Sequence, residues 1–165
     1  MLVRWMRRRD FPEVLKIGCK EIHHEDDLYD FMAKRYNIGL VVDQSPKIAE
    51  FGANYPVLGY ALIQFGSSFI HVASIATHPD YQRTGVGSLL IKHIKDKLSP
   101  FKRYFAYTQV EETNLKTQLF LKKNGFVAKA ILRYENGEDY IMQYDCPNMH
   151  RFKHLLETQN EKYFS

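Results

Sequence analysis

The alternation of hydrophobic and polar residues predicts seven strands and four helices, in the order β-α-α-β-β-β-α-β-α-β-β. The strands are expected at Leu2–Met6, Ile38–Val42, Val57–Phe65, Phe69–Thr77, Arg103–Val110, Phe126–Arg133 and Asp139–Tyr144. The helices are expected to begin at Asp10 and to span Glu25–Tyr36, Val86–Leu98 and Asn114–Asn124. This order predicts a mixed α/β (α+β) fold with a central sheet.

Several short signals fix the expected ends of these elements. Asp10 and Glu13 have the spacing of a capping box at the start of the first helix, which is expected to bury Phe11, Val14, Leu15 and Ile22. The last of the four helices is expected to bury Leu115, Leu119 and Leu121 and to close at Gly125, where left-handed backbone is favoured.

Turn signals join the strands. Gly66-Ser67-Ser68 predicts a hairpin, and Asn136-Gly137 predicts a second one within the turn 134–138. The polar segment 43–56 is expected to be a loop. Residues 1–145 are expected to form one domain. The tail 146–165 is expected to be helical, with Met149, Phe152, Leu155 and Leu156 facing either its own domain or a partner.

Composition narrows the class of protein. A chain of 165 residues with 45% hydrophobic residues can bury a core in a single domain. Two cysteines and no CxxC or Cys/His cluster argue against a disulfide scaffold or a metal site. No apolar run is long enough for a signal peptide or a membrane span, so we expect a cytoplasmic protein without membrane contact.

The charge balance is mildly basic, with a formal net charge of +4. This balance favours an anionic ligand, but acidic residues are interspersed throughout and no basic face is implied. The cluster Arg7-Arg8-Arg9 is expected to be a solvated strand end or a contact for phosphate or an acidic surface. Without an aromatic and basic motif, a nucleic-acid partner is not expected.

The stretch YQRTGVGSLL places two glycines, Gly85 and Gly87, between a strand and a helix. It lacks the Lys-Ser/Thr pair of a Walker loop, and Leu90 stands where a Rossmann fingerprint would need its third glycine. Backbone N–H groups and the helix dipole at such a junction suit a pyrophosphate, with Arg83 as an added contact. A plain tight turn is the alternative.

The wider context favours the pyrophosphate. Residues 74–90, SIATHPDYQRTGVGSLL, resemble the acetyl-CoA signature of the GNAT superfamily of N-acetyltransferases. Asn114, followed by Gly125-Phe126, matches the later helix of that family and its ending. Residues 134–142, YENGEDYIM, resemble the end of the bacterial ribosomal-protein N-terminal acetyltransferases and their relatives. The element order agrees over about residues 2–145, so the resemblance implies the GNAT fold.

The resemblance implies a site for acetyl-CoA as cosubstrate. Backbone N–H groups of Ile75, Ala76 and Thr77 would face the pantetheine and the acetyl carbonyl, and one of them would stabilise the oxyanion. The pyrophosphate would lie against Gln82, Arg83, Thr84, Gly85, Val86, Gly87 and Ser88. Asn114 would hydrogen-bond the pantetheine arm or, alternatively, satisfy local backbone at the start of its helix.

The catalytic side chains depart from the family pattern. The position of the base in the ribosomal-protein enzymes falls on Gln109 and that of the acid on Leu121. Glutamine can orient a water or the substrate but cannot accept a proton at neutral pH. Substitute residues are Glu111 and Tyr107 on the face of Gln109, Tyr134 and Tyr140 at the closing hairpin, and His23 and His24. Each of these also suits a strand or loop residue without a catalytic role.

Direct transfer to a protein N-terminal α-amine is the leading expectation for the reaction. At pH 7 an α-amino group is roughly 10–15% neutral and a lysine only about 0.04%, so a missing base matters less for the α-amine. The acidic loop Ile22-His23-His24-Glu25-Asp26-Asp27 differs from that of the related enzymes and would attract a cationic acceptor. A small-molecule amine acetyltransferase and a CoA-binding module with little catalysis remain alternatives, as monomer or homodimer.

Overall fold

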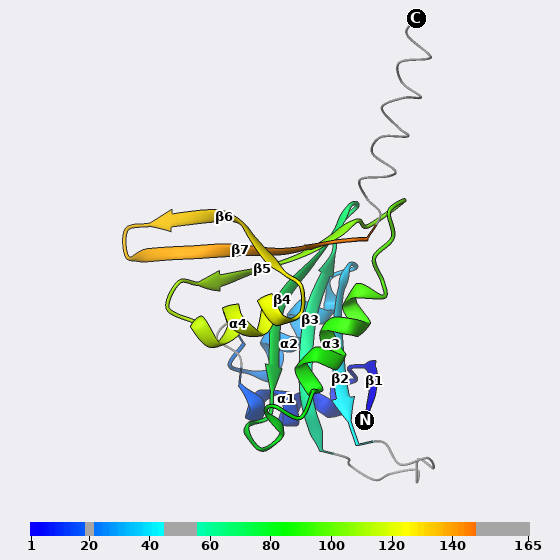
Figure 1. Cartoon of the computed structure of the whole chain (residues 1–165). Helices are drawn as coiled ribbons and strands as arrows, with labels where there is room; N and C mark the ends of the chain where they lie inside the picture. Colours follow the sequence, from blue (N-terminus) through cyan, green and yellow to red (C-terminus); the bar gives the residue numbers. More distant parts are fainter. Residues whose placement is uncertain (19–21, 45–55, 148–165) are drawn as a thin grey trace, which may run out of the picture. The chain divides into compact units, whose positions relative to one another are not determined.

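The computed structural model describes residues 1–18, 22–44 and 56–147, where seven strands and four α-helices follow the predicted order (Figure 1). The strands are β1 (Leu2–Trp5), β2 (Asn37–Asp43), β3 (Val57–Phe65), β4 (Phe69–Thr77), β5 (Phe105–Glu111), β6 (Val127–Tyr134) and β7 (Gly137–Asp145). The helices are α1 (Phe11–Ile17), α2 (Glu25–Ala33), α3 (Val86–Lys95) and α4 (Leu115–Lys123), with short 3₁₀ turns η1 (Arg8–Asp10) and η2 (Pro79–Tyr81). The predicted mixed α/β class is confirmed.

The chain forms two compact units. The first comprises Met1–Gly66 and His71–Asp96, and the second comprises Ser67–Ile70 and the chain from Lys97 onward. Strands of the first unit follow the order β1-β2-β3-β4, with antiparallel pairing of β1 to β2 and of β2 to β3. The second unit includes the first two residues of β4, Phe69 and Ile70. Its other strands follow the order β5-β7-β6, with antiparallel pairing of β5 to β7 and of β7 to β6.

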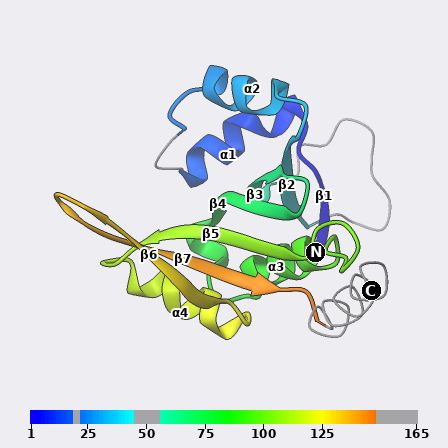
Figure 2. The ribbon, with the colours of Figure 1, turned by 90° about the horizontal axis from the view of Figure 1, so that it is seen from above.

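Helices cover both faces of the first unit's strands. In Figure 2, α1 and α2 lie on one face and α3 on the other. Residues Val57–Ile63 of β3 are accordingly all buried, as expected for a strand with helices on both sides. The core beneath α1 and α2 includes Phe11, Val14, Leu28 and Tyr60. The glycine turn lies between the end of β4 and the start of α3.

A largely buried ion-pair network joins β1, η1 and the end of β2 in the first unit. The guanidinium of Arg4 on β1 donates to both carboxylate oxygens of Asp10, at 2.7 and 2.8 Å, and its Nε donates to Asp43 on β2 at 2.6 Å. Both aspartates are buried. Burial alone would raise the pKa of Asp10, but hydrogen bonds from Arg4 and from the Arg7 backbone outweigh it and hold that pKa below its usual value.

Strand β5 organises the second unit. Its residues alternate in burial, with Ala106, Thr108 and Val110 buried and Gln109 and Glu111 exposed. The ring of Phe69, at the start of β4, contacts the rings of Phe105 and Tyr107 at centroid distances of 5.9 and 5.5 Å. One face of β5 therefore carries polar side chains to the surface of the unit.

The start of the first helix differs from the prediction. Asp10 makes no side-chain capping bond to α1, because its carboxylate accepts from Arg4 and from the backbone N–H of Arg7 instead. Glu13 pairs with Lys16 at 2.5 Å. The helix ends at Ile17, so Ile22 is not part of it, although its side chain is buried before α2. Helix α2 likewise ends at Ala33, and Tyr36 lies beyond it, exposed.

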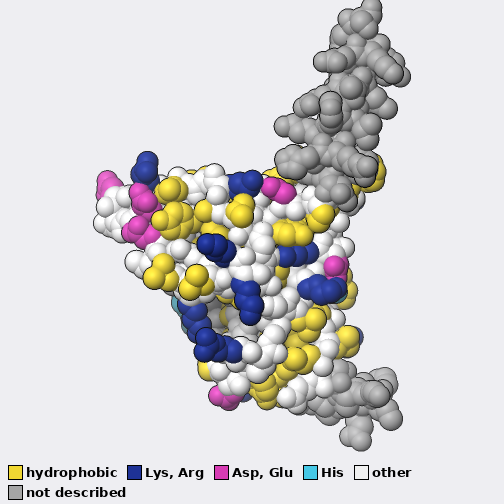
Figure 3. All heavy atoms as spheres, in the orientation of Figure 1, with side chains coloured by type: hydrophobic (Ala, Val, Ile, Leu, Met, Phe, Trp, Pro, Cys, Tyr) yellow, Lys and Arg dark blue, Asp and Glu magenta, His cyan; other side chains and the backbone are white. Residues whose placement is uncertain are grey.

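Helix α4 also differs from its prediction. Leu115 and Leu119 are 64% and 67% exposed, and Leu121 is fully buried. Apolar side chains of this kind are visible on the surface in Figure 3. The side-chain nitrogen of Gln118 donates to the backbone oxygens of Glu111 and Glu112, and Leu121 is the buried residue of the helix.

The predicted hairpin between β6 and β7 is confirmed within the turn 134–138, where Tyr134 pairs with Gly137 and residues 135–136 form the loop. Gly125 has the expected left-handed backbone, with φ of 83°. Most of the predicted loop 43–56 and nearly all of the predicted tail 146–165 lie outside the described residues. Within the described residues, no helix is both long and apolar enough to span a membrane.

Candidate active site

The glycine turn before α3 contains two residues with left-handed backbone. Arg83 has φ of 65° and Gly85 has φ of 94°. A side chain at Gly85 would meet no other atom within 4 Å, so glycine is required there by the backbone conformation rather than by lack of space. The backbone at Gly85 is therefore open on the side where its Cβ would be, and a ligand could approach it.

Helix α3 begins at this turn without a side-chain cap. Gly85 is the N-cap residue and offers no side-chain acceptor to the first turn. The N–H groups that begin a helix point along its axis and carry partial positive charge, which the ten residues of α3 reinforce. Val86, fully buried against Gly59 of β3, anchors the helix start. A Cβ at Gly59 would lie only 2.6 Å from Val86 and 2.8 Å from the Ala76 carbonyl oxygen.

The side chains around the turn suit an anionic ligand. Gln82, Arg83 and Thr84 are exposed and Ser88 is half-buried. The Thr84 hydroxyl donates to the carbonyl of Tyr81 at 2.6 Å, which closes the turn. Ile75, Ala76 and Thr77 are the half-buried last residues of β4, close to α3 through Gly59. These residues of the first unit fit a pyrophosphate and its pantetheine arm, and their roles in binding remain predictions.

Asn114 lies in the second unit, at the start of α4. Its side-chain oxygen accepts from the backbone N–H of Thr117 at 3.1 Å and caps the helix. The side-chain oxygen of Asn114 therefore satisfies local backbone, as the alternative expectation states. That bond does not use the amide nitrogen, so the predicted contact with pantetheine remains compatible with the cap.

A polar cluster lies on the exposed face of the second unit. The side-chain nitrogen of Gln109 donates to the hydroxyl of Tyr134 at 2.9 Å and to Oδ2 of Asp139 at 2.5 Å. Glu111 is the register partner of Asp139 across β5 and β7, and antiparallel partners share one face. The structure thus brings together all three predicted catalytic candidates, Gln109, Glu111 and Tyr134.

Asp139 was not among the sequence-predicted candidates. It joins the cluster because the 135–136 turn pairs Leu132 with Asp139 and leaves Tyr134 two residues farther along the same face. Sequence alone does not give the cross-strand register of the hairpin, so it did not identify Asp139 as a member of the cluster. Leu121, at the family's acid position, is fully buried and cannot reach a substrate.

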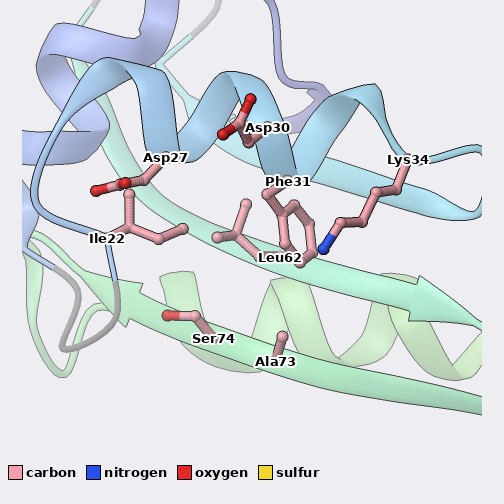
Figure 4. Close-up of a pocket in the computed structure, with 8 residues that line it drawn as sticks. All are labelled: Ile22, Asp27, Asp30, Phe31, Lys34, Leu62, Ala73 and Ser74. Atoms are coloured by element: carbon pink, nitrogen blue, oxygen red, sulfur yellow. The ribbon is translucent and has the colours of Figure 1, made fainter.

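A pocket of about 240 Å³ lies in the first unit beside α2, β3 and β4. Figure 4 shows the side chains of Ile22, Phe31 and Leu62 converging above Ala73 and Ser74 of β4. The remaining lining residues are Asp27, Asp30 and Lys34. Since Ser74 directly precedes Ile75, the pocket adjoins the segment expected to hold pantetheine.

Asp27 has a structural role at the rim of this pocket. Its Oδ2 accepts from the backbone N–H groups of His23 and His24, at 2.9 and 3.0 Å. These two bonds lower the pKa of the Asp27 carboxyl and keep it ionised. His23 and His24 themselves are exposed, as their loop interpretation predicts.

The arginine cluster 7–9, His78 and two strand tyrosines occupy exposed or half-buried positions. His78 is the N-cap residue of η2, and its side chain accepts from the backbone N–H of Asp80 at 3.3 Å. Arg7, Arg8 and Arg9 are exposed, and Arg8 lies 5.8 Å from the centre of the Tyr29 ring. Tyr107 and Tyr140 are half-buried strand residues.

Comparison with protein families gives one match. The model of the acetyltransferase (GNAT) family matches residues 2–126, about three quarters of the chain. No curated protein sequence gives a significant match.

Solved structures share the fold. The ribosomal-protein-S18-alanine N-acetyltransferase from Escherichia coli is 22% identical with a TM-score of 0.65, over 88% of this chain and 93% of that one. Naa20 from Chaetomium thermophilum, solved with a bisubstrate analogue, is 18% identical with a TM-score of 0.73, over 92% and 90%. A mutant of the spermidine N-acetyltransferase SpeG from Vibrio cholerae is 16% identical with a TM-score of 0.69, over 90% and 95%.

Proposed function

The chain belongs to the GNAT family of acetyltransferases, which use acetyl-CoA, and on this premise we propose that it acetylates the N-terminal α-amine of a protein. Acetyl-CoA supplies the thioester from which the acetyl group is taken. The predicted binding residues in the first unit are the backbone of Ile75–Thr77, the turn 82–88 and the start of α3. In the second unit, Asn114 is the predicted contact for the pantetheine arm.

The pocket beside β4 is the observation that carries the choice of acceptor. Its walls are apolar side chains, Ile22, Phe31 and Leu62, which suit the first side chain of a peptide. Two carboxylates, Asp27 and Asp30, outnumber the one ammonium of Lys34 in the lining. A positively charged peptide end is therefore attracted, whereas an acidic acceptor is repelled.

The chemistry of the amine supports the same choice. Only the neutral amine attacks a thioester, and roughly 10–15% of an α-amine is neutral at pH 7, against about 0.04% of a lysine. Gln109 stands where the related ribosomal-protein enzymes are expected to have their base, and an amide cannot remove a proton. The site is therefore better suited to an α-amine than to a lysine.

Matched acceptors test this proposal. Acetyl transfer would be measured on two peptides of one sequence, the first with a free N-terminus and blocked lysine, the second with the reverse arrangement. Spermidine and an aminoglycoside complete the set, because a spermidine N-acetyltransferase and an aminoglycoside 6'-N-acetyltransferase share this fold. We expect kcat/KM for the free N-terminus to exceed that for the lysine by about 10², following the neutral fractions.

Variants of the pocket link the preference to its residues. Phe31→Ala and Asp30→Asn are expected to raise the peptide KM while the Kd for acetyl-CoA stays unchanged. Asp96→Asn, an exposed aspartate of the same unit outside both the pocket and the glycine turn, is the control for charge alone. Preference for lysine, or turnover only with spermidine or the aminoglycoside, would replace the N-terminal acceptor with that other class. Tight acetyl-CoA binding without turnover of any amine would indicate a CoA-binding module.

A further inference from the structure

Strand β6 lies at the edge of the sheet in the second unit, on the outer side of β7 (Figure 1). All eight of its residues are exposed, and Ile131, Leu132 and Tyr134 are 46%, 38% and 55% exposed. Within the described residues, no strand pairs with its outer edge. An exposed apolar edge is the part of a sheet most prone to add a strand. We propose that β6 pairs with β6 of a second copy of this chain, antiparallel about a two-fold axis at Leu132.

The hairpin decides which backbone groups of β6 face the open edge. A two-residue loop joins Tyr134 to Gly137, so these two residues form the hydrogen-bonded pair next to the loop. Hydrogen bonding alternates along an antiparallel strand, so Leu132 also directs its N–H and C=O toward β7. The N–H and C=O groups of Ile131 and Arg133 therefore point to the open edge. In a symmetric pair these residues of both copies would exchange about four backbone hydrogen bonds.

A β-bulge limits the part of this edge that can pair. The register with β7 shifts between Ala128 and Ala130, with Lys129 at the irregularity. Bulges and lysines on an edge oppose the addition of a strand, so the start of β6 is protected. Residues 130–134 keep a regular register with β7 and contain no proline. Pairing with a second copy is therefore expected over this segment.

Charge selects one register for the second copy. If outward-facing residues are to meet within the regular segment, the axis lies at Ile131, Leu132 or Arg133. The axis at Ile131 would oppose Lys129 to Arg133, and the axis at Arg133 would oppose that residue to itself. Like charges directly opposite each other destabilise paired strands. The axis at Leu132 instead sets Lys129 opposite the exposed Glu135 of the copy, which joins opposite charges.

The cations of β6 also have partners within their own chain. Lys129 lies 3.3 Å from Asp145, and Arg133 lies 2.8 Å from Glu138. The side chains of the two cations are nevertheless 46% and 76% exposed. Their charges can therefore still interact with a second chain.

The same register covers the exposed apolar side chains. Leu132 meets its own counterpart at the axis, and Tyr134 lies opposite Ala130 of the copy, all on one face of the paired strands. On the other face, the aliphatic stem of Arg133 can cover Ile131 of the copy. Because the paired segment is short, we expect a weak dimer that dissociates on dilution.

Charge reversal tests this register. Lys129→Glu puts a carboxylate opposite Glu135 of the copy, and Glu135→Lys puts an ammonium opposite Lys129. Each variant alone should raise the dimer Kd about tenfold or more, because both symmetric charge pairs become repulsive. An equal mixture of the two variants joins opposite charges again, and its heterodimer should form with a Kd within about threefold of wild type. Lys122→Glu, an exposed lysine of α4, is the control that should leave the Kd within about threefold.

Disulfide formation locates the axis. Only the residue at the axis faces its own counterpart, at a Cα distance that suits a disulfide. In a background with Cys19 and Cys146 replaced by serine, Leu132→Cys should form a linked dimer with oxidised glutathione. Ile131→Cys and Arg133→Cys should remain mostly unlinked. Linking at one of these two residues in place of Leu132 would overturn the assigned register.

Sedimentation equilibrium measures the Kd values, and the melting temperature of each variant is the control for folding. A chain that stays monomeric up to about 0.5 mM would overturn the interface. A dimer whose Kd is unchanged by Lys129→Glu and by Glu135→Lys would also overturn it. These measurements do not involve acetyl transfer, so their outcome is separate from that of the proposed acceptor.

Discussion

At the scale of single residues, Gly85 has the most specific requirement in the chain. Its φ of 94° is rarely adopted by residues with a side chain, and the space where a Cβ would lie is open. The glycine therefore holds the backbone of the turn in a conformation that presents the first N–H groups of α3 outward. Substitution should affect both stability and the anion site.

We predict that Gly85→Ala weakens acetyl-CoA binding. Forcing alanine into left-handed backbone costs about 1–2 kcal/mol, and relaxation of the turn would move the N–H groups that receive the pyrophosphate. We expect the Kd, measured by titration calorimetry, to rise about tenfold or more, roughly one charge-assisted hydrogen bond.

Gly18→Ala is the matched control, because Gly18 has φ of 87° and also no atom within 4 Å of an added Cβ. It should lose similar stability with little change in this Kd. Equal changes in Kd for the two variants would contradict the assignment of the turn to the donor.

At the scale of elements, the network of Arg4, Asp10 and Asp43 ties β1, η1 and β2 together. We predict that Asp10→Asn destabilises the fold by about 3 kcal/mol, because removal of one partner leaves a largely buried guanidinium poorly compensated. The measurement is urea unfolding at pH 7, with Glu13→Gln as control because its partner Lys16 is exposed.

The same network predicts a pH dependence. The folded state lowers the pKa of Asp10, so the carboxylate stabilises the fold above the unfolded pKa of about 4. That contribution is lost as the pH falls from about 4 through the folded pKa. The difference in unfolding free energy between wild type and Asp10→Asn should therefore shrink below pH 4. A difference that stays constant down to pH 3 would contradict the role of the ionised carboxylate.

Helix α4 provides a prediction about which face is buried. Leu121→Ala should destabilise the protein by about 2–5 kcal/mol, because it leaves a cavity in the core, whereas Leu119→Ala should change stability by less than about 0.5 kcal/mol. Chemical denaturation of the two variants checks the difference. Equal losses would mean that Leu119 is buried in solution.

The elements that sequence predicts well are those whose signal is local. Strands β3 and β4 begin and end at the predicted residues, and α3 begins at Val86 after its glycine turn. The orientation of α4 could not be predicted, because Leu115 and Leu119 have the spacing of a core face and are nevertheless exposed, whereas Leu121 is buried. Apolar spacing alone does not distinguish the two faces.

The candidate site could be predicted only where its residues are neighbours in the sequence. The donor turn is a contiguous stretch, so its residues could be named in advance. The cluster at Gln109 depends on which residues of β5, β6 and β7 lie opposite each other, and a two-residue turn at Asn136-Gly137 would have moved each β6 partner by two residues. Asp139 therefore joins Gln109 and Tyr134 only once the observed turn is known.

At the scale of the whole molecule, the proposed binding tasks belong mostly to one of the two compact units. The glycine turn, the end of β4 and the acceptor pocket belong to the first unit. Gln109, Tyr134 and Asp139 belong to the second. Apart from Asn114, the residues proposed to bind the donor and the acceptor therefore all lie in the first unit, in two sets that share no residue.

We predict that Gly85→Ala and Phe31→Ala act independently. Because the glycine turn and the acceptor pocket share no residue, their effects on kcat/KM should multiply in the double variant, which means that the free-energy changes add within about 0.5 kcal/mol. Saturating acetyl-CoA should restore most of the turnover of Gly85→Ala, whose defect is in donor binding, but none of that lost by Phe31→Ala at subsaturating peptide. Steady-state rates of all four proteins at varied acetyl-CoA measure both effects. A double variant no slower than Phe31→Ala alone, at subsaturating acetyl-CoA, would show that the turn and the pocket act on one and the same step.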